Sequence, residues 1–486
     1  MNLFQAKLNK NPNLVHNFYY SFILSFINGA VNVLYPLVVG ILIGPIKYSF
    51  FAYLLAIINL SILLNESFLV PSTIRFVSTA IQEKKDQIYS SIWSIYFSFL
   101  ITVFIIFIFA HSLLNIDAFL DIMIFSILLI FITLHRYVKS IYQGLELYSH
   151  LVKIEIISLT IGVFFGLIQL FNYSFYQQLF FPLIVYHFSF IILSIFSYDI
   201  FKFKLDFNME VIKKILRYGF FSGMGSIISL GLNQYQIIFT SIKFSNLSTG
   251  QIAFWTYLTF PFTIFSLSLL NAIFPRMVKL SIKDQARVYN IITSLIKNLI
   301  LISILLVILL NLCVSLAYDL KIHFLTAYFS GNGVKIASLY LITGGGLIIF
   351  YSLSPLFSIY ENRIFVNSLL PFILLTVAII IWNLFINLED IIIPIGFLIA
   401  VIITTIASMS FAFYFEKIDI ELFGLFILYY AIEIILNLFG IIDSIFQNNI
   451  GLTLFVIPIL ILLILYSVYR LLVFLRKTNS YLVDVV

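Results

Sequence analysis

A few charged side chains in this sequence lie within or at the ends of long apolar runs. Lys297 lies about eight residues, or roughly 12 Å, into one of these runs if it is helical. Arg75 and Arg276 lie at the ends of two others, and Glu66 lies near the end of the run that precedes Arg75. Lysine and arginine bind phosphate oxygens well in a partly dehydrated site, and a glutamate there could pair with a base or take up a proton. These residues predict an anion-binding site, with helix pairing or simple charge anchoring as the alternative.

Small polar residues form a stripe in the first apolar run. Ser21, Ser25, Asn28, Asn32 and Tyr35 follow one another at steps of 4, 3, 4 and 3, which places them on one face of an α-helix. Such a stripe could line a polar cavity, with Asn28 and Asn32 binding a hydroxylated ligand. It could also serve helix packing alone.

The same stripe recurs later in the chain. Its members are Ser222, Ser226, Ser229, Asn233, Gln236 and Thr240. One offset, 201 residues, relates Ser21 to Ser222, Asn32 to Asn233 and Arg75 to Arg276. We interpret this as an internal repeat, in which Asn233 and Gln236 would line the second half of the same cavity.

The elements that carry these residues are predicted to be membrane-spanning helices. The sequence is 62% hydrophobic and only 10% charged, against about 25% charged residues in soluble domains. Its apolar runs approach the length of about 20 residues that a helix needs to cross a bilayer. We predict an all-α polytopic membrane protein with about fourteen spans. They cover 15–43, 48–70, 88–110, 119–138, 151–171, 178–200, 216–240, 252–275, 289–317, 335–360, 365–387, 391–415, 421–441 and 450–472.

The distribution of basic residues predicts the orientation. Of the 27 lysines and arginines, 22 fall on the side of the N-terminus, 4 on the opposite side, and Lys297 within a span. Basic residues of short loops stay in the cytoplasm, so both termini are expected there. The abundance of Ile, Phe, Asn and Lys favours an AT-rich bacterial genome, so the expected location is a bacterial inner (cytoplasmic) membrane. The net charge of +6 therefore indicates membrane topology and lipid contact, and no nucleic-acid partner is expected.

A basic connection at 202–217 divides the chain after six spans. It is either a solvated linker or an interfacial helix on anionic lipid. We predict an N-terminal six-helix bundle (1–203), a C-terminal six-helix bundle (204–415) and two additional helices with a cytoplasmic tail (416–486). An even number of spans gives the two bundles the same orientation, and parallel repeats of this kind bind substrate between the halves.

Four segments resemble a known family: ILIGPIKYSFFAY (41–53), PSTIRFVS (71–78), YQGLELYSHLVKIEIIS (142–158) and LLNAIFPRMVKL (269–280). They are similar to the glycine-proline turn, the small-polar-arginine segment, the Gln-Gly-hydrophobic-Glu connection and the Phe-Pro-Arg helix end of the O-antigen (lipid-linked oligosaccharide) flippases. These are polysaccharide exporters of the multidrug/oligosaccharidyl-lipid/polysaccharide exporter superfamily. The glutamate and glycine that usually follow the family's glycine-proline turn are missing here.

This resemblance implies a V-shaped cavity between two bundles and transport by alternating access. The implied substrate is a polyprenyl-pyrophosphate-linked oligosaccharide, flipped from the cytoplasmic to the outer leaflet for surface polysaccharide (O-antigen or capsule) synthesis. A glycan polymerase and its chain-length machinery are implied as partners. Another exporter of the same fold, of the multidrug or lipid II type, is the first alternative, and a membrane polymerase or acyltransferase is the second.

Other polar groups within the spans have two interpretations each. Glu155 could form an ion pair with a basic residue or take up a proton. Lys153 lies only two positions away, on another face of the helix, and is not a natural partner. His187 is expected to be a hydrogen-bonded core histidine, with a proton relay as the alternative. Glu433 is expected to serve packing or partner contact, and the run 344–346 (GGG) to permit close packing or a bend.

The sequence shows no pattern of an enzyme. The single cysteine, Cys313, excludes a disulfide framework and a cysteine-based metal cluster. We find no nucleotide-binding glycine loop and no catalytic constellation, so no catalytic, metal or cofactor site is expected.

Overall fold

In the computed structural model, the described residues are 14–79, 90–98, 119–145, 147–172, 176–197, 208–259, 285–323, 325–358, 364–416, 427–431 and 450–483. Positions 88, 100, 101, 105, 262, 277, 424 and 425 are also described.

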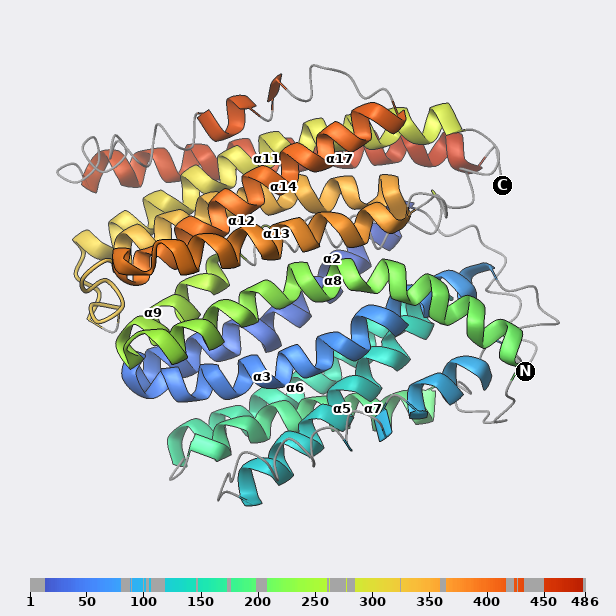
Figure 1. Ribbon diagram of the computed structural model, residues 1–486, viewed down its shortest axis with the longest axis horizontal. Helices are drawn as coiled ribbons and strands as arrows, with labels where there is room; N and C mark the ends of the chain where they lie inside the picture. The colour runs from blue at the N-terminus through green and yellow to red at the C-terminus, as the bar shows by residue number, and fades with distance from the viewer. Residues whose placement is uncertain are drawn as a thin grey trace. The chain divides into compact units, whose positions relative to one another are not determined.

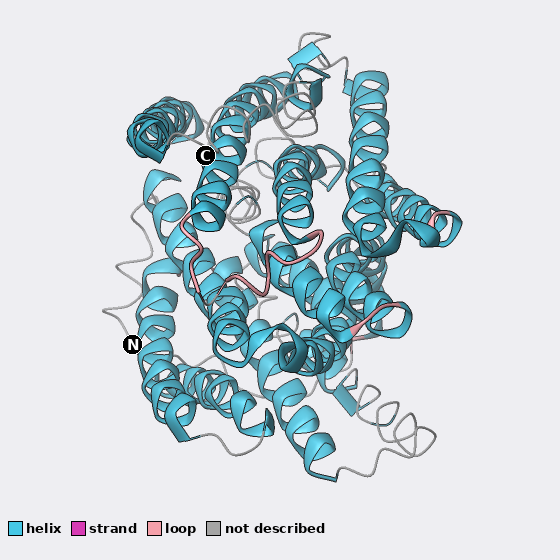
Figure 2. Ribbon diagram, turned by 90° about the vertical axis from the view of Figure 1, so that its left-hand side faces the viewer, coloured by secondary structure: helices cyan, strands magenta, loops and turns pink. Residues whose placement is uncertain are grey.

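Every regular element among the described residues is a helix, and no strand occurs in them (Figures 1 and 2). The α-helices are α2 (Leu14–Gly29), α3 (Tyr35–Thr79), α5 (Phe119–Gly144), α6 (Tyr148–Asn172), α7 (Phe181–Ser197), α8 (Met209–Lys243), α9 (Asn246–Thr256), α11 (Gln285–Asp319), α12 (Gly333–Ser358), α13 (Ile364–Leu384), α14 (Ile392–Glu416) and α17 (Ile450–Val483). A π-helix, η1 (Ala30–Leu34), and three 3-10 helices, η3 (Tyr176–Phe180), η5 (Tyr257–Thr259) and η7 (Ile386–Ile391), complete them. The predicted all-α fold class is confirmed.

The helices have the length and composition of membrane spans. Within the described residues, seven helical stretches are long and apolar enough to cross a bilayer, and one of them, Tyr19–Leu63, covers most of the first two predicted spans. The predicted spans at 151–171, 289–317, 335–360 and 391–415 each agree with a helix to within a few residues. Hydropathy locates these helices because lipid requires about 20 apolar residues whatever the helix packs against. The protein is a multi-pass membrane protein.

The first two spans are joined by a single glycine. α3 is continuous from Tyr35 to Thr79 except at Gly44, whose φ of 75° and ψ of 163° break the helix. Pro45 follows directly, so the glycine-proline pair forms the turn that the sequence predicts between spans 15–43 and 48–70. A second glycine, Gly250 of α9, lies close to this turn. A Cβ added at Gly250 would lie 2.1 Å from the carbonyl oxygen of Pro45. The absence of a side chain therefore allows α9 to pack directly on this turn.

The helix that starts the second half begins earlier than the sequence predicts. α8 begins at Met209, capped by the side chain of Asn208, which accepts from the backbone N–H groups of Glu210 and Val211. The predicted start was 216, so most of the basic connection at 202–217 is the first turns of α8. Lys213 and Arg217 are exposed on this extension. An Asx N-cap followed by an acidic residue explains why the helix starts here.

Two compact units divide the chain, and one contains residues 27–257 and 362–393. In this unit α3 packs against α8, α5 and α9, α6 packs against α7, and α8 packs against α13 (Figure 1). Tyr35 donates its hydroxyl to the carbonyl oxygen of Leu179. Trp382 of α13 is buried, donates to the carbonyl oxygen of Ile393 at 3.0 Å, and has its ring centroid 5.4 Å from that of Phe239 of α8.

The other unit contains residues 1–26, 258–361 and 394–486. Here α11 packs against α12 and α17, with Leu460 of α17 against Leu312 of α11. Ser303 of α11 donates to the carbonyl oxygen of Gly345 of α12 at 3.0 Å, and Tyr429 donates to that of Ile342 at 3.0 Å. A Cβ at Gly345 or Gly346 would lie 1.9 Å from the hydroxyl of Tyr429 or Tyr430 respectively. The predicted role of the run 344–346 in close packing is thereby confirmed.

These units group the helices differently from the predicted bundles 1–203 and 204–415, because α8, α9 and α13 lie with helices of the first half. Contact grouping records which helices pack together and not which ones descend from a common repeat or move together. The two-bundle division therefore stays a prediction.

Candidate functional site

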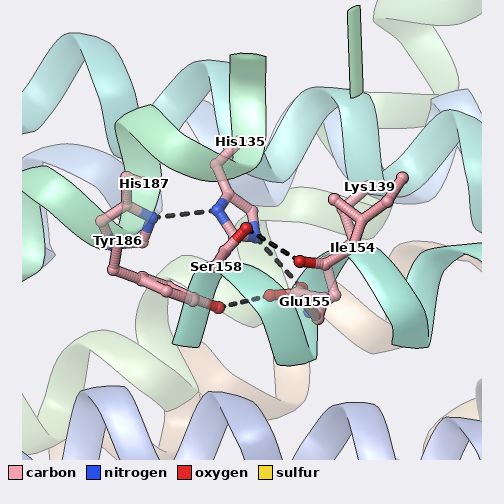
Figure 3. A network of polar contacts seen from close by, with 7 residues as sticks. All are labelled: His135, Lys139, Ile154, Glu155, Ser158, Tyr186 and His187. Atoms are coloured by element: carbon pink, nitrogen blue, oxygen red, sulfur yellow. Dashed lines mark hydrogen bonds and ion pairs between the residues drawn. The ribbon is translucent and has the colours of Figure 1, made fainter. Parts of the chain in front are cut away.

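A buried polar network joins α5, α6 and α7 around the carboxylate of Glu155 (Figure 3). Lys139 of α5 donates from Nζ to Oε1 of Glu155 at 2.6 Å. Nε2 of His135, also on α5, lies 3.1 Å from the same oxygen. Tyr186 of α7 donates its hydroxyl to the other oxygen, Oε2. The carboxylate is fully buried and therefore takes its partners from two neighbouring helices, α5 and α7, in place of water.

His187 extends this network by one ring. Its Nδ1 lies 3.1 Å from Nδ1 of His135, and both imidazoles are buried (Figure 3). Phe190, one turn further along α7, stacks on the His135 ring with centroids 3.7 Å apart and planes at 14°. The stacked phenyl ring and the two hydrogen bonds fix the orientation of the His135 imidazole. His187 is thus buried and hydrogen-bonded, as we expected, and this geometry leaves the alternative of a proton relay open.

Helix periodicity explains how these side chains meet. His135 and Lys139 are four residues apart and share one face of α5. α5 ends at Gly144 and α6 begins at Tyr148, so the two helices form a tight hairpin. Lys139 and Glu155 lie at similar distances on either side of that turn, which places them at the same depth. Lys153, two residues before Glu155, is exposed, in agreement with its rejection as a partner.

The sequence points to Glu155 and His187 separately and gives no sign of His135 and Lys139. The distribution of basic residues assigns Lys139 to the cytoplasmic side, but in the structure it is buried within α5. The symmetry of the 139 and 155 positions about the hairpin turn was the signal that could have found the pair.

Arg75 lies near the end of α3 and contacts α8. Its Cζ is 4.4 Å from the ring centroid of Tyr218, a geometry that gives a cation–π interaction. Phe76 meets the same ring edge to face, with centroids 6.2 Å apart. For Arg75 the sequence leaves phosphate binding and simple charge anchoring open, and the structure shows that one face of its guanidinium group is occupied by an aromatic ring.

The polar stripe of the first helix passes through η1. Ser21 is buried and Ser25 and Asn32 are half-buried, while the side chain of Asn28 lies outside the described residues. Asn32 belongs to the π-helical turn Ala30–Leu34. A π-turn contains more residues than an α-turn, so it shifts the register that the steps of 4 and 3 assumed. Ser21 and Tyr35 therefore do not lie on one continuous α-helical face, and π-turns of this kind are frequent at functional sites.

The second stripe is described only over its last three members. Gln236 and Thr240 are buried on α8, and Thr240 donates its hydroxyl to the carbonyl oxygen of Gln236 at 2.6 Å. Asn233 is half-buried, yet its Oδ1 is buried and has no hydrogen-bond partner among the described residues. A buried amide oxygen is costly to leave unsatisfied, so a donor from a polar ligand would stabilise this group.

The remaining predicted site residues are only partly described. Lys297 is half-buried on α11. Glu66 lies on α3, but its side chain is outside the described residues, and Arg276 and Glu433 lie outside them entirely. The structure thus brings Arg75 against α8 and leaves the assembly of the predicted anion site a prediction.

Comparison with solved structures shows which known fold this architecture shares. A multidrug resistance MATE family transporter of the MOP superfamily, in an outward-facing conformation, matches with a TM-score of 0.62 and 14% identity, covering 85% of this chain and 97% of its own. The lipid II flippase MurJ, in an inward closed conformation, matches with a TM-score of 0.60 and 17% identity, covering 93% of this chain and 100% of its own. The chain has the MOP fold. The Vibrio cholerae MATE transporter VcmN is a further match, with a TM-score of 0.57, 13% identity and coverage of 83% and 98%.

No family model matches the sequence, and no curated protein matches it significantly. At these low identities, the neighbours show the MOP fold and do not show which substrate the chain carries.

Proposed function

We propose that this MOP-fold protein is a lipid flippase of a bacterial cytoplasmic membrane. It carries a polyprenyl-pyrophosphate-linked oligosaccharide from the cytoplasmic to the outer leaflet by alternating access, for the synthesis of O-antigen or a capsule. A glycan polymerase and its chain-length machinery would then take the product at the outer face. In this proposal both termini of the chain lie in the cytoplasm.

The observation that carries this proposal is the extent of the structural matches. MurJ aligns with 93% of this chain, whereas the MATE transporter aligns with 85% of it. MurJ is therefore the better model for a chain of this length, and a lipid-linked substrate is favoured over a free drug. α17, in the region that follows the predicted repeats, packs on α11 and presents apolar residues such as Leu462 and Leu465, which suit lipid contact.

The polar groups within the spans fit such a substrate. Sugars and a pyrophosphate require hydrogen-bonding amides and a few cations, and the predicted lining supplies Asn32, Asn233 and Gln236 with Arg75 and Lys297. The buried, unsatisfied Oδ1 of Asn233 fits a sugar hydroxyl as its donor. Cations near a pyrophosphate gain strength from partial dehydration.

Depletion of the protein in its host tests the proposal. Lipid-linked oligosaccharide should accumulate on the cytoplasmic leaflet, and wild-type protein should restore its passage. Arg276→Ala or Lys297→Ala should lower the flipping rate about tenfold or more, because a charge-assisted hydrogen bond contributes about 1.5–3 kcal/mol. Lys321→Ala is the matched control, since Lys321 is an exposed cation in the connection between α11 and α12.

Two other outcomes would contradict the proposal. Accumulation of unpolymerised repeat units on the outer leaflet would identify a polymerase. Normal passage of the oligosaccharide together with drug sensitivity would identify a multidrug exporter, the second candidate, which the MATE match with its TM-score of 0.62 favours.

A further inference from the structure

The Glu155 network contains the most deeply buried charges among the described residues, and the proposed substrate lining does not use them. Glu155 and His187 are 0% and 2% exposed, and Lys139 is 4% exposed. Buried charges within a membrane protein are costly, so a network of this size requires a reason beyond helix packing.

The hydrogen bonds define where protons lie in this network. Oε1 of Glu155 is an acceptor, so Nε2 of His135 donates to it. A neutral His135 then has a bare Nδ1, which accepts from Nδ1–H of His187. A neutral His187 consequently has a bare Nε2, and this buried atom has no hydrogen-bond partner among the described residues. The chain of bonds therefore ends in one vacant proton acceptor.

A proton that arrives at Nε2 of His187 can pass along this chain. His187 gains it at Nε2 and gives its Nδ1 proton to Nδ1 of His135, so that His135 becomes the cation and His187 is neutral again. No other bond forms or breaks, and the network gains one positive charge. A pair of imidazoles joined through nitrogen is suited to this transfer.

The added positive charge on His135 lies next to a carboxylate oxygen that already contacts a cation. Nζ of Lys139 and Nε2 of His135 both contact Oε1 of Glu155, at 2.6 Å and 3.1 Å, while Oε2 is taken by Tyr186. With His135 charged, two cations share one carboxylate oxygen in a low-dielectric site, where like charges repel strongly.

The groups that face the two imidazoles come from all three helices. α5 contributes Arg136 and Lys139, α6 contributes Glu155, and α7 contributes Tyr186. Among the described side chains of α3 and η3, which also pack on α5, none acts as a charge on these rings. Among the described groups that face these rings, the single carboxylate is already matched by Lys139, so a charged His135 has no counter-charge of its own.

We propose that the His187–His135 pair is a proton-binding site, and that proton uptake displaces Lys139 from Glu155 and loosens the packing of α5 against α6 and α7. Burial favours the uncharged imidazoles in the packed arrangement, so the proton binds only with this rearrangement. By reciprocity, a conformation that separates these helices binds the proton more tightly. In the proposed flippase, on which this last step rests, the site would couple a proton gradient to the change of access.

Hydrogen–deuterium exchange of the purified protein in nanodiscs tests the site without any substrate. We expect backbone exchange in 135–158, corrected for the chemical exchange rate, to be about threefold faster at about pH 5.5 than at about pH 7.5. His187→Asn keeps a donor toward His135 but has no proton acceptor of histidine type, and it should abolish this acceleration. His150→Asn, at an exposed position of α6, should retain it. An unchanged wild type, or an equal response of His187→Asn, would overturn the proposal.

Nitrogen NMR of ring-labelled histidines in the wild-type protein gives an answer even if the variant does not fold. The Nδ1–H···Nδ1 bond identifies the pair by its coupling across the hydrogen bond. We expect one ring of the pair to become doubly protonated between the same two pH values. If both rings stay neutral, the proposal fails.

A flipping assay separates this proposal from the proposed function. Proteoliposomes carrying an undecaprenyl-pyrophosphate-linked saccharide should show flipping that an imposed pH gradient accelerates in wild type and not in His187→Asn. If flipping occurs but depends neither on the pH gradient nor on His187→Asn, the proposed function stands and the proton site is rejected. If hydrogen–deuterium exchange responds to pH but no flipping occurs, the proton site stands and this substrate is rejected.

Discussion

Arg75 of α3 lies over the ring of Tyr218 of α8, with Cζ 4.4 Å from the ring centroid. The predicted boundary between the two sequence halves, at 203/204, runs between these two residues. Phe76 packs on the edge of the same ring, so the end of α3 and the beginning of α8 are held by one cationic and one aromatic contact. Arg75 and Arg217, which the sequence treats alike as cations at the ends of spans, therefore differ: Arg217 is exposed.

We predict that the aromatic ring, and not its hydroxyl, is what Arg75 requires. Tyr218→Phe should leave the thermal unfolding temperature in detergent nearly unchanged, whereas Tyr218→Leu should destabilise by about 0.5–2 kcal/mol through loss of the cation–π contact. In Arg75→Ala the further effect of Tyr218→Leu should be smaller, because the two residues act as a pair. Additive effects in this double-mutant cycle would show that the contact contributes nothing. Lys213→Ala, exposed on α8, serves as the control.

We predict that Gly250→Ala prevents the normal packing of α9. The added Cβ would lie 2.1 Å from the carbonyl oxygen of Pro45, and backbone atoms cannot move aside as a flexible side chain does. The expected cost is about 3 kcal/mol or more, seen as a loss of folded protein in size-exclusion chromatography.

Gly331→Ala is the comparison for that variant. Gly331 has a φ of 59° and open space around its Cβ position, so only backbone strain of about 1–2 kcal/mol is expected. Equal yields of the two variants would contradict the close approach of α9 to Pro45.

We predict that Gly346→Ala is destabilising and that Tyr430→Phe partly rescues it. The new Cβ would lie 1.9 Å from the Tyr430 hydroxyl oxygen but 3.0 Å from Cζ, so removal of the hydroxyl relieves the worst overlap. Thermal unfolding of the two single variants and the double variant measures this. The idea fails if Tyr430→Phe makes Gly346→Ala worse.

We predict that Glu155 and Lys139 are strongly coupled in stability. Glu155→Gln leaves Lys139 as a buried cation without its carboxylate, and Lys139→Met leaves the carboxylate without its closest cation. Each should cost about 3–5 kcal/mol, and the double variant should cost clearly less than their sum. Thermal unfolding is again the measurement, and strict additivity would argue that the two groups do not depend on each other. Lys153→Met, at an exposed position of α6, should have little effect.

The sequence by itself determined the helical, multi-pass nature of the protein and the positions of most spans. This succeeded because a bilayer imposes a length and an apolar composition on each helix separately, without reference to its neighbours. The turn at Gly44 and Pro45 and the close packing at 344–346 were also predictable, since each depends on glycine or proline at a particular place. The start of α8 differs from the predicted start of its span, because the basic connection at 202–217, for which the sequence leaves a linker and an interfacial helix open, contains the charged first turns of the helix.

Only the tertiary structure decided which polar groups meet. His135, Lys139, Glu155, Tyr186 and His187 come from three helices, and their contacts depend on how each helix is rotated about its axis. Hydropathy does not report that rotation, and the π-turn Ala30–Leu34 shows that even a regular stripe can lose its register. The sequence therefore locates the helices, because each must satisfy the bilayer alone, while the packing of one helix on another selects the partners of the few buried charges.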